Sequence, residues 1–278
     1  MKNFFCRQSL LSFVLISGVM TQSDIAQGMH PSADELGHKL FETVAQFSMD
    51  NNHHPTKIDF VRKLIAAHAN VNVPNVLDNT PLIEAASMGA VLKRSAYVNA
   101  LLDAGADVNI QGFNGRTALM WAAHDGDHEM CRTLIAAKSN ITLCNGEGHT
   151  ALMLAARWGN PTALSVLIEA HNNLLRSRKQ VLFATWTAAP MEICDMVHPF
   201  VEDFINDIDN TGKTPLILAV WQATILPYLG QLEDTVRVLL AAGADTTVID
   251  NDGHTARYYA EQMADSPSKD AVLALLSA

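Results

Sequence analysis

Short apolar segments recur along the chain, and most of them come in pairs that are separated by polar loops. In the most regular segment, Thr117 is followed by Ala-Leu-Met-Trp-Ala-Ala and then, after two polar residues, by Gly126. The large and small apolar residues of this segment fall on one face of a helix, and its alanines let a second helix approach closely. The pattern therefore predicts a short helix that packs against a partner helix.

Polar residues mark the two ends of this predicted helix. The hydroxyl oxygen of Thr117 can accept a hydrogen bond from the free N–H groups of the first turn. In two other copies of the segment a proline, Pro81 or Pro215, follows the threonine, where its φ already suits a helix. Gly126 supplies the left-handed residue that ends the helix. A second apolar run at 130–135 completes a pair of helices.

This unit returns at intervals close to 33 residues. The equivalent threonines are Thr80, Thr117, Thr150, Thr214 and Thr255, so the successive steps are 37, 33, 64 and 41 residues. The 64-residue step is close to twice 33, which predicts one hidden, degenerate copy. A repeat of this length that carries Thr-Pro-Leu-x-x-Ala is the ankyrin signature. With five copies of the signature, the chain resembles the ankyrin-repeat family.

The resemblance implies an all-α fold, an ankyrin-repeat solenoid of about seven stacked helix-turn-helix units with short hairpin loops. One pair of helices cannot bury its apolar face alone, so neighbouring pairs have to stack. Residues 174–206 lose the signature; the period favours a degenerate repeat there, and a helical insertion that contacts a partner is the alternative. The domain at 29–278 then comprises an N-terminal cap unit at 32–74, regular repeats at 75–173, the degenerate repeat or insertion at 174–206, a repeat with a loop insertion at 207–249 and a C-terminal cap unit at 250–278.

Residues 1–28 have the features of a secretory signal peptide. Lys2 and Arg7 precede an apolar run at 9–20, and the small residues Ala26 and Gly28 stand where a signal peptidase would cleave. The alternative is an apolar N-terminal helix that packs on the first repeat. Because the run is too short for a membrane span, we expect an exported protein, periplasmic or secreted, with no membrane segment in its mature form.

The charge and the cysteines narrow the classes of partner. A formal net charge of −10 disfavours nucleic acid, because affinity for nucleic acid rests on neutralising phosphates, and the basic segment 176–179 is too sparse to reverse this. After cleavage three cysteines would remain, Cys131, Cys144 and Cys194. Their odd number and spacing match neither a disulfide framework nor a zinc site.

Motifs for chemistry are also missing from the sequence. No phosphate-binding loop, hydrolase elbow or metalloprotease helix occurs, and the adjacent His53 and His54 lack a third metal ligand at a defined spacing. We therefore predict no enzyme activity, no cofactor and no metal. The alternative is a small enzyme or sensor whose site lies in the helical insertions 174–206 and 223–230, where Glu192, Asp195 and His198 share one helical face.

The function implied by the resemblance is to bind another protein. Proteins of this family usually bind partners with the hairpin tips and the exposed end of the first helix, on a concave face. The tryptophans and arginines at these positions match the composition of an interface hot spot. The predicted contact residues are Val76, Leu77, Met88, Phe113, Arg116, His124, Arg157, Trp158, Lys213 and Trp221.

Two details of this hypothesis stay open at the level of the sequence. Trp158 and Trp221 could instead fold back over the neighbouring helix and extend the core, whereas Trp121 replaces a normally buried residue and is predicted to be core. The identity of the partner is not given by the sequence. An exported, monomeric protein of this kind would act as an immunity, accessory or effector factor.

Overall fold

The computed structural model describes residues 31–49, 56–87, 94–185, 204–226 and 231–277. Within these ranges it contains twelve α-helices, one 3-10 helix (η1, Phe113–Gly115) and no strand, so the predicted all-α class is confirmed. The chain divides into two compact units, Met1–Phe113 and Asn114–Ala278. The predicted signal peptide at 1–28 lies outside the described residues.

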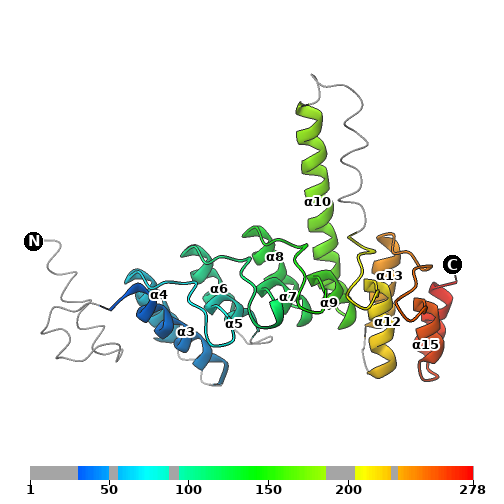
Figure 1. Cartoon of the computed structure of the whole chain (residues 1–278), viewed down its shortest axis with the longest axis horizontal. Helices are drawn as coiled ribbons and strands as arrows, with labels where there is room; N and C mark the ends of the chain where they lie inside the picture. The colour runs from blue at the N-terminus through cyan, green and yellow to red at the C-terminus, as the bar shows by residue number, and fades with distance from the viewer. Residues whose placement is uncertain (1–30, 50–55, 88–93, 186–203, 227–230, 278) are drawn as a thin grey trace, which may run out of the picture. The chain divides into compact units, whose positions relative to one another are not determined.

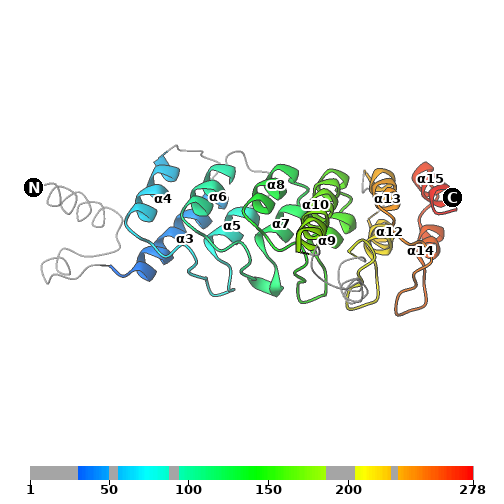
Figure 2. The same ribbon diagram turned by 90° about the horizontal axis from the view of Figure 1, so that it is seen from above.

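The first unit contains two pairs of helices. Helix α3 contacts both α4 and α5, and α6 contacts α4 and α5, so the two pairs pack side by side (Figures 1 and 2). Leu40, Val44, Leu64 and Leu101 are fully buried between them. The helices of this unit are α3 (Ala33–Met49), α4 (Thr56–Ala66), α5 (Pro81–Ser87) and α6 (Arg94–Asp103).

The second unit contains four pairs of helices arranged in two rows (Figure 2). In one row α9 lies between α7 and α12, and α12 contacts α14; in the other, α10 lies between α8 and α13, and α13 contacts α15. The helices are α7 (Ala118–His124), α8 (His128–Ala136), α9 (Ala151–Arg157), α10 (Pro161–Thr185), α12 (Pro215–Ile225), α13 (Leu232–Ala241), α14 (Ala256–Gln262) and α15 (Pro267–Leu275).

The predicted threonine caps are confirmed at every first helix of the second unit. The hydroxyl oxygens of Thr117, Thr150, Thr214 and Thr255 each accept a hydrogen bond of 3.3 Å from the backbone N–H three residues later. These bonds satisfy one of the free N–H groups of each helix. Gly126 has a φ of +73°, as expected for the residue that ends α7.

The hairpins before α5, α9, α12 and α14 are held by one polar side chain each. An Oδ1 atom accepts hydrogen bonds from the backbone N–H groups two and four residues later, which fixes the tight turn. Backbone bonds also join neighbouring hairpins, for example from Gly146 N to Asn114 O at 2.9 Å and from Asn251 N to Thr211 O at 3.0 Å. The residues that hold the turns are Asn75, Asn145, Asp209 and Asp250.

Among the described residues no helix pair lies between α9 and α12, which favours the insertion alternative over a hidden repeat. The two helices contact each other directly, and Asn210 N donates to Glu147 O at 3.2 Å, in the manner of the other neighbouring hairpins. Helix α10 has 25 residues, whereas α8 has nine and α13 has ten, so residues 174–185 prolong the second helix of the preceding pair (Figure 1). The described residues thus form six helix pairs rather than seven.

The insertion alternative agrees with how this segment begins and ends. The ring of Phe204 stacks on that of His171 with centroids 4.4 Å apart, so the chain returns to the side of α10 before the next hairpin starts. The period indicates a repeat, but an insertion of nearly one repeat length produces the same spacing. Glu192, Asp195 and His198 lie outside the described residues.

Candidate protein-binding surface

Aromatic rings and cationic side chains alternate along the hairpins and first helices of the second unit. Their contacts form two series, one within and between the pairs of α7 and α9 and the other between the pairs of α9, α12 and α14, and the two series meet where Arg157 and Trp158 are adjacent in the chain. We call the two series together the cation–aromatic strip. It consists of Arg116, Trp121, His124, Arg157, Trp158, Lys213, Trp221 and Tyr259.

One end of the strip is built on α7. The guanidinium carbon of Arg116 lies 4.5 Å from the ring centroid of Trp121, and the edge of Trp121 meets His124 with a centroid distance of 5.9 Å. His124 in turn packs against Trp158 of the next pair, with centroids 4.6 Å apart. Its Nδ1 atom lies 2.9 Å from Asp125 Oδ1, which fixes the orientation of the imidazole.

The other end of the strip centres on Trp221. Arg157 and Lys213 both lie over its ring, at 5.3 Å and 5.6 Å from the centroid. Arg157 is itself held by a hydrogen bond from its Nε atom to Gln222 Oε1 at 2.9 Å, and its Nη1 atom lies 3.6 Å from Glu147 Oε2. The two cations come from consecutive helix pairs, and both hold the ring of Trp221 by cation–π contact.

A network of buried polar and charged side chains lies next to the strip. His149 has only 5% of its side chain exposed, and its Nε2 atom lies 3.1 Å from Asp209 Oδ2. Burial by itself raises the pKa of Asp209. The hydrogen bonds from His149, from Thr211 and from the backbone of Lys213 outweigh burial and lower this pKa to about 2. Asp209 is therefore a carboxylate that the hairpin holds in its charged form.

Asp250 has the corresponding role in the next repeat along the chain. Its Oδ2 atom accepts a 2.6 Å hydrogen bond from the Tyr259 hydroxyl and lies 3.3 Å from Lys213 Nζ. Burial raises the pKa of Asp250, but the bonds from Tyr259, from the backbone of His254 and from Lys213 lower it overall. Burial and the hydrogen bond to Asp250 raise the pKa of Tyr259. Lys213 contacts both Trp221 of the strip and Asp250 of the last hairpin, so it links the two.

The buried carboxylates make stability depend on pH in acid. Because the folded-state pKa of Asp209 is depressed, its contribution is present above the pKa of about 4 in the unfolded chain and is lost as the pH falls towards 2. Asp250 acts in the same direction. We expect the free energy of unfolding, measured with urea, to fall by about 2 kcal/mol between pH 5 and pH 2 through Asp209 alone.

An Asp209→Asn variant serves as the control for this pH dependence. It should be less stable at pH 5 and should lose less stability on acidification, because no carboxylate remains at this position to be protonated. Equal pH slopes for the two proteins would show that Asp209 does not carry the effect.

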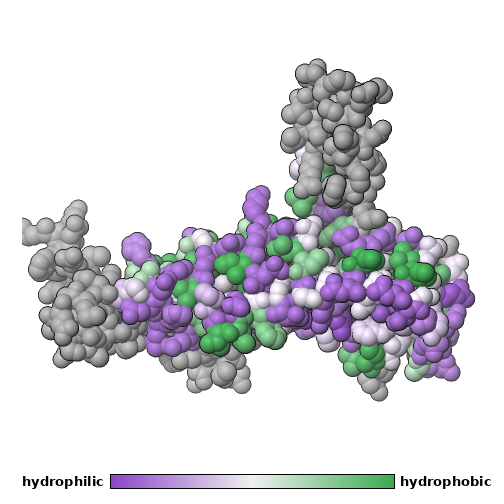
Figure 3. All heavy atoms as spheres, viewed as in Figure 1, coloured by the Kyte–Doolittle hydropathy of each residue, from purple (hydrophilic) through white to green (hydrophobic). Residues whose placement is uncertain are grey.

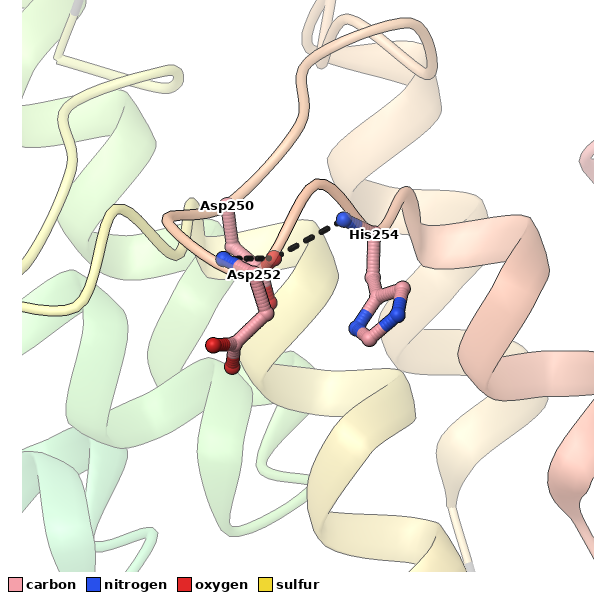
Figure 4. A group of neighbouring side chains, drawn as sticks. All are labelled: Asp250, Asp252 and His254. Carbon is pink, nitrogen blue, oxygen red and sulfur yellow. Dashed lines mark hydrogen bonds between the residues drawn. The ribbon is translucent and has the colours of Figure 1, made fainter.

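Three possible metal ligands lie together on the last hairpin, Asp250, Asp252 and His254 (Figure 4). Asp250 Oδ1 accepts hydrogen bonds from the backbone N–H groups of Asp252 and His254, at 3.0 Å and 2.9 Å. Its Oδ2 atom faces Tyr259 and Lys213. The Asp250 carboxylate thus already contacts two backbone amides, a hydroxyl and an ammonium group. These contacts explain its position, because they hold the hairpin in its turn.

The predicted contact residues fall into two groups. Val76, Leu77 and Phe113 belong to the first unit, where their side chains are 99%, 48% and 57% exposed at the hairpin tips. Met88 lies outside the described residues. The other six belong to the second unit, where they are members of the strip: Arg116, His124, Arg157, Trp158, Lys213 and Trp221.

Two sequence-based interpretations need adjustment. Lys213 is only 7% exposed, so its ammonium group braces Asp250 and Trp221 instead of standing free on the surface. Trp121, predicted to be core, is only partly buried and carries Arg116 on its ring. Trp158 and Trp221 are also partly exposed, so each packs on neighbours and still presents some of its ring to the surface.

Sequence reasoning missed the supporting network and some of the apolar surface. The sequence does contain a signal for the network, because an Asn or Asp stands five residues before the capping threonine in three repeats of the second unit. These residues are Asn145, Asp209 and Asp250. At the end of α12, Ile225 and Leu226 are 54% and 41% exposed and form an apolar patch (Figure 3). Helix α12 has 11 residues whereas α7 and α9 have seven, and these two apolar residues lie in and just after its extra turn.

Comparisons with known proteins agree with this architecture. A family model for ankyrin repeats in three copies matches residues 88–177, and a model for a single ankyrin repeat matches 211–251. None of the curated proteins matches the chain in sequence. Within the described residues, no helix combines the length and the apolar character that crossing a membrane requires.

Two solved structures share the fold. The ankyrin-repeat protein EF0377 is 22% identical with a TM-score of 0.60, and an ankyrin-repeat domain from Acinetobacter baumannii AYE is 20% identical with a TM-score of 0.62. In both comparisons the match covers 86% of this chain and 96% of the other. Paired helices with hairpins between them define a helical repeat protein. The chain contains ankyrin repeats at the matched residues and has the ankyrin-repeat fold.

Proposed function

We propose that this chain is an exported protein that binds another protein through the cation–aromatic strip and carries out no chemistry of its own. Ankyrin repeats are in general protein–protein interaction modules. The observation that carries the proposal for this chain is the strip itself, in which Trp158 and Trp221 are partly exposed and held by Arg157, His124 and Lys213.

The strip has the physical properties of a binding hot spot. Tryptophan, tyrosine and arginine are the side chains most enriched where truncation costs most binding energy. A ring that is already fixed by its neighbours loses little conformational entropy when a partner covers it. Trp221 is fixed in this way, because Arg157 and Lys213 both lie over its ring and are themselves held by Gln222 and Asp250.

Export and the biological role belong to the same proposal. The charged, apolar and small-residue order at 1–28 supports a signal peptide. An exported binding protein without its own chemistry fits an immunity, accessory or effector role, in which it protects or inhibits an enzyme or engages a host protein. Sequencing the N-terminus of the natural product tests export, since an intact Met1 on the exported protein is incompatible with cleavage near residue 28.

Affinity purification from the native cells tests the binding surface. The wild-type chain should retain one specific protein that a Trp158→Ala/Trp221→Ala variant loses. An Arg132→Ala/Arg237→Ala variant is the matched control, because both arginines are exposed on second helices, away from the strip. Recovery of the same protein by all three would move the contact away from the strip and contradict the proposal.

A further inference from the structure

Arg116 is the one cation of the strip that meets no carboxylate at close range within the described residues. Arg157 lies 3.6 Å from Glu147 and Lys213 lies 3.3 Å from Asp250. The guanidinium carbon of Arg116 instead lies 4.5 Å from the ring centroid of Trp121. Arg116 forms no ion pair, at a limit of 4.0 Å between nitrogen and oxygen, with any described residue. Its planar fork of N–H donors therefore lies against the indole and makes no ion pair with a described residue.

The pKa of Arg116 shows that this arrangement disfavours the charged guanidinium. Burial lowers the pKa of the guanidinium, Glu147 and Asp125 act against this at longer range, and Arg157 adds to it by repulsion. A partly buried cation whose desolvation is not offset by a nearby anion gains most from a ligand that brings one.

Trp121 contributes a second unsatisfied donor at the same place. Its Nε1 atom is buried and has no acceptor among the described residues. A buried N–H group without an acceptor is unfavourable, because its lost hydrogen bond to water is not replaced, and this N–H belongs to the ring on which Arg116 lies. The stacked pair thus combines a cation without a close anion and an N–H group without an acceptor.

We propose that Arg116 and Trp121 form a receptor for a carboxylate, so that the partner protein meets this end of the strip with an exposed Asp or Glu side chain. The inference rests on the proposed function and adds the chemistry of the partner. Carboxylates match the guanidinium fork with two parallel hydrogen bonds. The rings of His124 and Trp158 continue from Trp121, so the residues beside this acidic side chain would be apolar or aromatic.

Peptide selection against the full chain tests this inference. A displayed library of random twelve-residue peptides should yield binders enriched in Asp and Glu beside apolar residues. For one such peptide, Arg116→Ala should weaken the dissociation constant measured by calorimetry about thirtyfold, which corresponds to about 2 kcal/mol. Replacing the acidic residue of the peptide by alanine should weaken binding equally, and combining both changes should add little.

Three further variants separate the carboxylate contact from a general effect of charge or folding. Arg116→Lys should restore the affinity incompletely because an ammonium group lacks the planar fork. Trp121→Ala removes the ring on which Arg116 lies, so its affinity should also fall. Arg132→Ala removes an exposed charge from α8 and should bind like the wild type, with all thermal midpoints measured to confirm folding.

The outcomes distinguish this inference from the proposed function. Peptides without acidic enrichment, or binding that is unchanged in Arg116→Ala, overturn the carboxylate receptor. If those peptides still lose affinity in the Trp158→Ala/Trp221→Ala variant, the strip remains the binding surface and only its preference for acidic partners is wrong. Peptides that depend on neither set of residues contradict both.

Discussion

Asp209→Ala is expected to lower the free energy of unfolding by about 3–5 kcal/mol, because it removes a carboxylate that accepts several hydrogen bonds, and each buried donor left without an acceptor costs about 1–3 kcal/mol. Asp209 is 6% exposed, and its carboxylate accepts hydrogen bonds from His149 Nε2 and from the backbone N–H groups of Thr211 and Lys213. Alanine would leave the donors of His149 and Lys213 buried without an acceptor, at the hairpin that places α12 beside α9.

Asp245→Ala is the matched control for this prediction. Asp245 makes the same contacts with the residue two positions later, because its Oδ1 atom accepts hydrogen bonds from the backbone and the hydroxyl of Thr247, each at 2.7 Å. It is exposed, and its hydrogen bonds can be replaced by water. Urea unfolding should therefore show a large loss for Asp209→Ala and a small one for Asp245→Ala. Similar losses would mean that the local turn, and not the buried pair with His149, stabilises the hairpin.

The sequence predicted the features of this fold that depend on local interactions. A threonine that caps a helix and a glycine with positive φ act within a few residues, so Thr117, Thr150 and Gly126 could be assigned correctly from their neighbours alone. Stacking of the pairs followed from the same reasoning, because helices such as α9 expose too much apolar surface to stand alone.

The insertion after α10 could not be predicted because its length imitates a repeat. The 64-residue spacing of Thr150 and Thr214 is equally consistent with a hidden unit and with a helix that continues to Thr185. Only the direct contact of α9 with α12 distinguishes the two. Apolar content does not, because residues 174–206 are rich in apolar side chains in either case.

The candidate surface was predictable by position but not by its pairings. Equivalent places in the repeat identified Arg157 and Trp158. Which groups meet depends on contacts between repeats, such as Arg157 with Gln222, 65 residues away, or His149 with Asp209, 60 residues away. The position of Lys213 in the repeat did not predict that it is buried, because its ammonium group pairs with Asp250 of the next hairpin.

Leu216→Ala is expected to lower the free energy of unfolding by about 3–4 kcal/mol, within the range for fully buried leucines. Leu216 is 0% exposed in α12, the helix that contacts α9 on one side and α14 on the other. In a repeat protein, stability is close to a sum of repeat and interface contributions. A cavity at this position therefore weakens two interfaces at once, and urea unfolding should show the loss in the whole second unit.

Leu276→Ala removes the same atoms from the end of the chain and is the matched control. Leu276 is 8% exposed just after α15, which contacts α13 and α14 and has no further helix pair beyond it among the described residues. Its loss should be about 1–2 kcal/mol, because a terminal repeat relaxes more easily around a cavity. Hydrogen exchange should locate this smaller loss in α14 and α15 only. Equal losses for the two variants would contradict a stack in which each pair is stabilised by its neighbours.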